Sequence, residues 1–335
     1  MAGLVMMGLG VGRTEAQPAA PAYHLVQTTP LGAPDRWDYV VFDRPSHRVY
    51  VAHGDTLSVV DGPSGRLVGK VEGIAGGTHG TAVSVAAGQG FTDDGKAGVV
   101  VAFDLATLKI LTRIPAADDA DGIVADPVTG HIFVVDGDPG KVSVIDPRTD
   151  AGIATLDGGG KLEAAVADGR GRLFVNGEAK RDVVVIDTRT DRVLAHWPIP
   201  DCESPHGIAV DPVGGRLFTS CENSLMEVLD TSTGKVVAAV PIGLGSDSAA
   251  WDPKRKRAFS SNGADGTISV IQQKTADSYE ALAPIVTVRS GRTMDLDPET
   301  GRLFVAAADL DPNVAPGARR RALPGSLRLL SYDPR

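Results

Sequence analysis

The sequence predicts an all-β protein, a seven-bladed β-propeller with four-stranded antiparallel blades. Three observations support this prediction: strand-like segments recur with a period of about 42 residues, most repeats hold four of them, and one extra segment precedes the first repeat. The 335-residue chain also has 40 glycines and only 5% aromatic residues, which is typical of many short strands joined by tight turns.

The first strand of each repeat ends at a marker residue, usually an aspartate. Pro or Gly often follows, as in YVVFDRP and GIVADPV, and favours a turn. A second strand comes after that turn, as in HIFVV and RLFVN, and a third reads TLSVVD or KVSVID. The markers, in order, are Asp43, Ser84, Asp126, Asp168, Asp211, Asp252 and Asp297.

Fourth strands follow in most repeats, for example GRLVGKVEG, LKILTRIP and GKVVAAVPIG. The seventh repeat has none, because the chain ends just after SLRLLSYDP. The segment Tyr23–Gly32 resembles the fourth strands, so we expect it to complete the last blade and close the ring, which leaves only short sheet edges. Residues 22–335 would then form one propeller domain. The alternative, six blades with an extra hairpin, is disfavoured by the even spacing.

The first 21 residues predict a secretory signal peptide, or else a disordered N-terminus. They contain the apolar run MAGLVMMGLGVG, and a small-residue pattern around Ala16 is typical of a cleavage site. We therefore expect a periplasmic or secreted protein. In an exported chain, Cys202 and Cys221 are expected to form a disulfide, with a Cys-His-Cys metal site that includes His206 as the alternative.

The net charge of −9 disfavours nucleic acid and anionic membranes as main partners, since both require a basic surface. No stretch of the sequence is long and apolar enough to cross a membrane as a helix. Few aromatic residues are available to stack on nucleic-acid bases. We expect a monomer whose partner is a small molecule or a protein.

The second and third strands resemble those of a known family. The segments VYVAHG, IFVVDG, LFVNGE, LFTSCE and AFSSNG, each followed by a strand of the VxVID type, are similar to the YncE-like, or YVTN-repeat, family of exported seven-bladed β-propellers. The resemblance covers essentially the whole mature chain, although no repeat contains the Tyr-Val-Thr-Asn tetrad intact. It implies export and a ligand- or protein-binding role. Single-stranded DNA binding, known for a member of that family, is the lowest-ranked alternative.

One ionisable residue in each repeat lies five positions before the marker. In an antiparallel blade the first strand begins at the rim where the second strand ends, so these seven side chains should meet at one mouth of the central channel. We expect this mouth to be the ligand-binding surface. The seven residues are Asp38, His79, Asp121, Glu163, His206, Asp247 and Arg292.

Four carboxylates at one mouth repel one another, by about 1–4 kcal/mol for each close pair. Arg292 falls between Asp247 and Asp38 in the circular order and is expected to pair with one or both. A divalent metal ion would relieve the remaining charge: imidazole with carboxylates suits zinc, copper, iron or manganese, and oxygen ligands alone suit calcium. The alternative is a hydrated mouth whose polar residues only link the blades. The candidate metal ligands are His79, His206, Asp121, Glu163 and Asp247.

The loops between second and third strands add polar side chains to the same rim, with His53 the first candidate to join His79. The long connection Leu310–Gly325 carries Arg319, Arg320 and Arg321, and is expected to be either a lid that meets an anionic group or a mobile basic loop. The other loop residues are Asp93, Asp94, Asp136, Asp138, Glu178, Glu222, Asn223, Asn262 and Asp309.

Common catalytic signatures are missing from the sequence: it has no Gly-x-Ser-x-Gly elbow, phosphate-binding Gly-Lys-Ser/Thr loop, CxxC or HExxH motif. Two hypotheses therefore rank above single-stranded DNA binding. The first is a non-catalytic exported propeller that binds a small ligand, a metal ion or a protein at its mouth. The second is a metal-dependent hydrolase, lyase or oxidoreductase that uses the same His/carboxylate site. The sequence alone assigns no catalytic residue.

Overall fold

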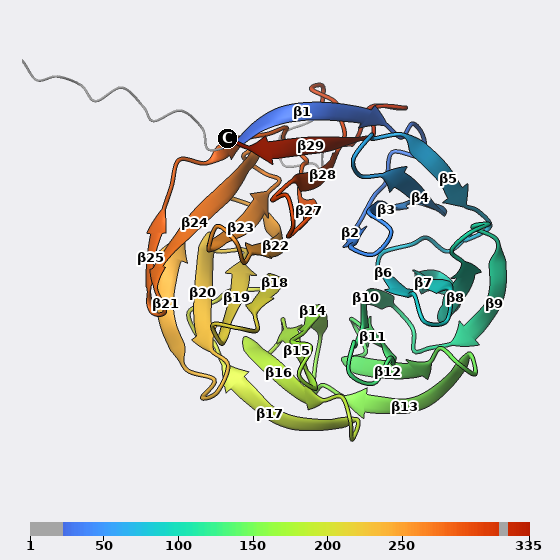
Figure 1. Ribbon diagram of the computed structural model, residues 1–335, viewed down its shortest axis with the longest axis horizontal. Helices are drawn as coiled ribbons and strands as arrows, with labels where there is room; N and C mark the ends of the chain where they lie inside the picture. Colours follow the sequence, from blue (N-terminus) through green and yellow to red (C-terminus); the bar gives the residue numbers. More distant parts are fainter. Residues whose placement is uncertain (1–22, 315–320) are drawn as a thin grey trace, which may run out of the picture.

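The computed structural model describes residues 23–314 and 321–335. Its strands form seven antiparallel sheets around a common axis, so the predicted seven-bladed propeller is confirmed (Figure 1). The predicted signal peptide, residues 1–21, lies outside the described residues, as do Arg319 and Arg320. No helix in the described part of the chain is long and apolar enough to span a membrane.

Each of the first five blades uses four consecutive strands, which run from the axis outward. Blade 1 consists of β2 (Val40–Asp43), β3 (Arg48–His53), β4 (Thr56–Asp61) and β5 (Leu67–Val71). Blade 2 consists of β6 (Thr81–Ser84), β7 (Gln89–Asp94), the short 3-10 helix η1 (Gly95–Ala97), β8 (Val99–Asp104) and β9 (Ile110–Pro115). Blade 3 consists of β10 (Ala120–Ala125), β11 (Ile132–Asp136), β12 (Lys141–Asp146) and β13 (Ala151–Asp157). Blade 4 consists of β14 (Leu162–Ala167), β15 (Arg172–Gly177), β16 (Asp182–Asp187) and β17 (Arg192–Pro198). Blade 5 consists of β18 (Pro205–Asp211), β19 (Arg216–Cys221), β20 (Leu225–Asp230) and β21 (Val236–Pro241).

Blades 6 and 7 depart from this scheme in their outermost strand. In blade 6, two short strands, β25 and β26, both pair with β24 and share the outer position. The strands of blade 6 are β22 (Ser246–Asp252), β23 (Arg257–Asn262), β24 (Thr267–Thr275), β25 (Ser278–Ala281) and β26 (Ile285–Val286). Those of blade 7 are β27 (Thr293–Leu296), β28 (Leu303–Ala307), β29 (Arg328–Pro334) and β1 (Tyr23–Pro30).

The N-terminal strand closes the ring, as the sequence predicts. Strand β1 pairs antiparallel with β29, from Tyr23 opposite Pro334 to Pro30 opposite Arg328 (Figure 1). The last blade is therefore assembled from both ends of the propeller, so each of the seven described sheets has an outer strand.

The core lies between neighbouring blades. Each second strand places one aromatic ring at the same position, and each of these rings is at most 1% exposed. Large rings at this repeated position fill the wedge between two sheets, and their burial dominates the stabilisation of the interface. The seven rings belong to Tyr50, Phe91, Phe133, Phe174, Phe218, Phe259 and Phe304.

The marker aspartates lie at the rim opposite the mouth and stabilise turns. The Asp126 carboxylate accepts a hydrogen bond from the Thr129 amide (2.9 Å), and the Asp252 carboxylate accepts one from the Arg255 amide (2.9 Å). Such side-chain bonds to the backbone favour a tight turn after the strand. The recurrence of Asp at the marker position is therefore explained by turn formation.

Replacing Tyr23 with alanine should destabilise the propeller through its closure. The Tyr23 ring is 1% exposed and packs edge-on against Phe259, with ring centroids 5.5 Å apart. We expect Tyr23→Ala to lower the free energy of unfolding by about 3 kcal/mol. The matched control is Leu25→Ala in the same strand, where the side chain is 50% exposed. Denaturant unfolding measures both, and equal losses in the two variants would contradict the assigned role of β1.

Candidate functional site

The seven predicted mouth residues all lie at the beginning of an innermost strand or within two residues of it. Asp121, Glu163, His206 and Asp247 belong to β10, β14, β18 and β22. All seven side chains are half-buried. The structure therefore places one ionisable side chain per blade at the same rim, and contacts between neighbouring blades decide which of them interact.

Arg292 links two of the carboxylates. Its Nη1 lies 3.0 Å from Oδ2 of Asp247, and its Nη2 lies 3.3 Å from Oδ2 of Asp38 and donates to the Trp37 carbonyl (3.0 Å). One guanidinium thus pairs with the carboxylates of both neighbouring blades, as its place in the circular order indicated. Charge-assisted hydrogen bonds of this kind are stronger than neutral ones, so Arg292 stabilises both carboxylates in their ionised form.

Three side chains from blades 4, 5 and 6 converge more closely, and we call Glu163, His206 and Asp247 the mouth triad. Nδ1 of His206 lies 3.4 Å from Oδ1 of Asp247 and 3.8 Å from Oε1 of Glu163. One ligand atom from each residue lies within 4.8 Å of the others. The opposite ring nitrogen, Nε2, faces the Ser204 hydroxyl at 3.2 Å and the Glu222 carboxylate at 3.6 Å.

Tyr39 belongs to the site but was not identified from the sequence. Its hydroxyl donates to Oε1 of Glu163 (3.5 Å), although the two residues lie in blades 1 and 4. Its side chain also packs against the hydrophobic cluster of blades 4 and 5. A tyrosine from one blade therefore reaches across the channel below the charged residues. Burial and the nearby carboxylates raise its pKa well above the ordinary value, so Tyr39 remains a neutral donor.

Tyr39 is the largest residue at its position in the repeat, because the equivalent residue is Gly, Ala or Ser in blades 2 to 6 and Thr293 in blade 7. A Cβ atom added at Gly80 would lie 2.2 Å from the Asp121 carbonyl oxygen, and one added at Gly207 would lie 2.4 Å from the Ala249 nitrogen. At these two positions the inner strands are too crowded for a side chain. One large residue among the small ones was thus a visible signal in the sequence.

His79 is held within its own blade. Its Nδ1 lies 2.7 Å from Oδ2 of Asp93, whose other oxygen accepts the His79 and Gly80 amides at 2.7 and 2.9 Å. Asp93 is fully buried. Burial disfavours the charged form of His79, but Asp93 outweighs this effect and raises the pKa of the imidazole. Of the five predicted metal ligands, the structure thus groups Glu163, His206 and Asp247, and it places neither His79 nor Asp121 in that group.

His53 does not join the site. Its Nε2 faces the carbonyl oxygens of Gly32 (3.1 Å) and Pro34 (2.5 Å), so this nitrogen carries the proton and donates. Its Nδ1 then accepts from the Ser58 hydroxyl at 2.8 Å. Burial lowers the pKa of His53, which keeps the ring neutral. His53 therefore fastens the segment between β1 and β2 to blade 1.

Most of the other loop residues also bond locally. Asp136 accepts from Ser143 (2.8 Å), and Asp309 pairs with Arg328 (2.7 Å). Glu222 is an exception, because its carboxylate faces Nε2 of His206 in the mouth triad. Sequence position alone could not separate these cases, since all of them lie at or just after the end of a second strand.

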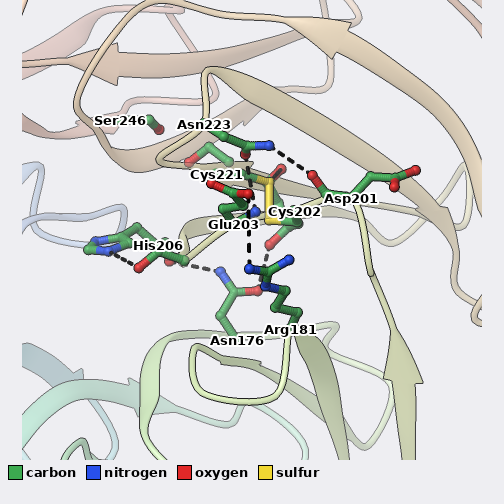
Figure 2. The surroundings of a disulfide bond; sticks show 12 residues. Asn176, Arg181, Asp201, Cys202, Glu203, His206, Cys221, Asn223 and Ser246 are labelled. Atoms are coloured by element: carbon green, nitrogen blue, oxygen red, sulfur yellow. Dashed lines mark hydrogen bonds and ion pairs between the residues drawn. A yellow bond between two sulfur atoms is a disulfide. The ribbon is translucent and has the colours of Figure 1, made fainter.

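The backbone at His206 is held from two sides (Figure 2). Cys202 and Cys221 form a disulfide that joins the chain just before β18 to the end of β19, and both are fully buried. Asn176 of blade 4 donates to the carbonyls of His206 (2.8 Å) and Gly207 (3.2 Å), and its own oxygen accepts from Thr219 (2.5 Å). Because both sulfurs are in the disulfide, they are not ligands in a Cys-His-Cys site.

Burial and mutual repulsion control the protonation of the mouth. Burial raises the pKa of Glu163 to about 7 and that of Asp38 to about 6, against the opposing charges of His206 and Arg292. Burial and the Glu163 charge raise the pKa of Asp121 well above its ordinary range. Several carboxyls therefore retain protons at pH values at which exposed ones are ionised.

His206 and Asp247 form the ionised part of the triad. Burial opposes the imidazolium of His206, but Asp247 and Glu163 outweigh it and raise the pKa to about 9. Burial also disfavours an ionised Asp247, yet His206 and Arg292 lower its pKa. Asp247 therefore lies between two cations, and the triad can exchange the His206 proton for another cation.

The raised pKa of Glu163 predicts a pH-dependent stability. The folded protein favours the neutral carboxyl, so its contribution is fully present below the unfolded value near 4.5 and is lost as pH rises through about 7. In chelator-treated protein, Glu163→Gln should raise the free energy of unfolding relative to wild type at pH 8 more than at pH 4.5, by at most about 3 kcal/mol.

Exposed Glu72 provides the control for this measurement. Glu72→Gln should show no such change between the two pH values. Denaturant unfolding at each pH gives the difference. A constant difference between wild type and Glu163→Gln would contradict the assigned protonation.

Comparisons with known proteins support the fold. No family model and no curated protein match the chain. Solved structures that match include RRP9 WD40 repeats (TM-score 0.77, 12% identity, 95% of this chain and 99% of that chain). Kuenenia stuttgartiensis hydrazine synthase matches with a TM-score of 0.70 at 16% identity, over 85% of this chain and 96% of that chain. A chain of a mitotic checkpoint complex matches with a TM-score of 0.71 at 18% identity, over 91% of this chain and 96% of that chain. At these identities the similarity shows the β-propeller fold alone.

Proposed function

We propose that the protein is a binding propeller whose mouth triad holds a divalent metal ion or the cationic group of a small ligand. The observation that carries this proposal is the convergence of one ligand atom each from Glu163, His206 and Asp247 to within 4.8 Å. The three residues come from three different blades, so the rigid ring and not a flexible loop positions them.

The donor set fits a transition metal better than calcium. Imidazole nitrogen with two carboxylate oxygens suits Zn²⁺, Mn²⁺ or Fe²⁺. Histidine ligands usually donate their second N–H to a carboxylate or hydroxyl, and Nε2 of His206 has both Glu222 and Ser204 within 3.6 Å. Arg292 holds Oδ2 of Asp247 and leaves Oδ1 facing His206.

Protons compete with any cation at this site. To bind a cation, His206 must lose its proton, although its pKa is raised to about 9. Glu163 must ionise, although its pKa is raised to about 7. Metal affinity should therefore rise with pH between 6 and 9, and binding should release protons.

Metal-dependent catalysis is the second candidate function. Three protein ligands leave coordination positions open, as catalytic metal sites do.

We also propose that the protein is exported and belongs to the YncE-like family. The apolar N-terminal stretch supports export, and the VxVID-type strands support the family.

Calorimetric titration of chelator-treated protein with Mn²⁺ and with Zn²⁺ tests the metal site. Wild type should bind about one equivalent, and His206→Ala and Asp247→Asn should each weaken binding at least tenfold, because the first removes a ligand atom and the second removes the negative charge of a ligand. The matched control is His196→Ala. His196 also pairs with a carboxylate, Asp182 at 2.8 Å, but in the outer strands of blade 4.

The control should retain wild-type affinity. Failure of wild type to bind either ion, or an equal loss in the control, would contradict the proposed metal site. Melting curves of the variants show whether a loss of binding follows from unfolding.

A further inference from the structure

A cleft of about 1250 Å³ opens at the mouth between blades 6, 7 and 1. Its walls include Arg36, Asp38 and Arg292, and the far wall is the connection between β28 and β29 at Arg321 and Ala322. The described parts of that connection, residues 308–314 and 321–327, are joined by backbone hydrogen bonds from the Asp311 amide to the Arg321 carbonyl (2.8 Å) and from the Leu323 amide to the Asp309 carbonyl (2.7 Å). The cleft is therefore a formed feature of the rim.

The lining of the cleft holds three arginines, Arg36, Arg292 and Arg321, against two aspartates, Asp35 and Asp38, so its formal charge is positive. The Asp35 carboxylate accepts the amides of Gly325 (2.6 Å), Ser326 (2.8 Å) and Leu327 (3.1 Å), so its oxygens are occupied. The other lining carboxylate, Asp38, pairs with Arg292.

Two guanidinium groups remain for a ligand. Arg36 and Arg321 line the cleft, both are exposed, and neither has an ion-pair partner within 4.0 Å among the described residues. Guanidinium groups bind carboxylate and phosphate oxygens through charge-assisted, often bidentate, hydrogen bonds.

Arg292 connects this cleft to the mouth triad. The same guanidinium lines the cleft and lies 3.0 Å from Oδ2 of Asp247. A cation bound at Oδ1 of Asp247 weakens the attraction between that carboxylate and Arg292 at Oδ2, which leaves the guanidinium more available to an anion. An anion at Arg292 in turn releases Asp247 for the cation. The two binding events should therefore favour each other by the same factor.

We propose that the cleft binds an anionic oxygen group, a carboxylate or a tetrahedral oxyanion, cooperatively with the cation of the mouth triad. The ligand class is then a small molecule that carries both charges, either a zwitterion or an anion bound to a metal ion. The cooperative part rests on the proposed cation site, whereas the anion site stands on the cleft alone.

Calorimetric titrations with sulfate and with acetate, each with and without Mn²⁺, test the proposal. The double variant Arg36→Gln/Arg321→Gln should lose affinity for the better anion about tenfold, since two charge-assisted contacts are removed. Its control is Arg66→Gln/Arg170→Gln, which makes the same change in net charge with exposed turn residues at the opposite rim. The control should change affinity less than about twofold.

The Mn²⁺ arms separate this inference from the proposed function. Saturating Mn²⁺ should strengthen anion binding by wild type at least about fivefold, and the effect should vanish in His206→Ala. Mn²⁺ binding that leaves anion affinity unchanged overturns the cooperativity but not the cation site. Absence of Mn²⁺ binding overturns the cation site, while a loss of anion affinity confined to Arg36→Gln/Arg321→Gln still supports the anion site.

Failure of wild type to bind either anion overturns the anion site. An equal loss of affinity in both double variants also overturns it, because the effect would then come from net charge alone. A preference for sulfate over acetate identifies a tetrahedral oxyanion as the better ligand group, and the reverse identifies a carboxylate; either preference supports the anion site.

Discussion

The convergence of seven inner strands on one axis determines most features of the mouth. At the crowded level of Gly80 and Gly207 an added Cβ would collide with the next blade, at 2.2 and 2.4 Å. Side chains one residue earlier lie at the rim, where they project from every blade toward the same space. Tyr39 is the exception that crosses the channel, and its hydroxyl reaches Glu163 of blade 4. The convergence of the strands thus brings the charged side chains together at the rim.

Collected charges must be compensated, and the structure shows two ways in which this occurs. Arg292 and His206 lie on either side of Asp247, so the carboxylate with two cationic neighbours is the one whose pKa is lowered. Asp121 and Glu163 lack an equal share of positive charge, and burial and repulsion raise their pKa values. Protons, a metal ion or a cationic ligand can fill the same electrostatic role, which makes binding at the mouth depend on pH.

The fold could be predicted from the sequence almost completely, because the repeat shows itself in strand patterns and turn residues. Even the closure by Tyr23–Pro30 followed from one unpaired segment. The exception is blade 6, where β25 and β26 divide the outer position and no fourth-strand pattern was evident. Chain geometry also placed the seven mouth residues at one rim, since that prediction needs only strand direction.

The contacts within the site could not be predicted in this way. Whether a histidine meets a neighbouring blade or its own loop depends on side-chain direction, which separates His206 from His79 and His53. The link from Asn176 to the His206 carbonyl joins two different blades, and the pattern within a single repeat does not indicate it (Figure 2). Such contacts arise from packing between repeats, whereas the sequence pattern describes each repeat separately.

The central claim is that His206 carries a positive charge in the unliganded mouth because two carboxylates surround it. The most direct measurement is an NMR titration of the His206 ring nitrogens in chelator-treated wild type and in Asp247→Asn. A wild-type pKa of about 9 that falls in the variant is the expected result. A pKa near 6.5 in the wild type, unchanged in Asp247→Asn, would contradict the charge balance on which the proposed cation site rests.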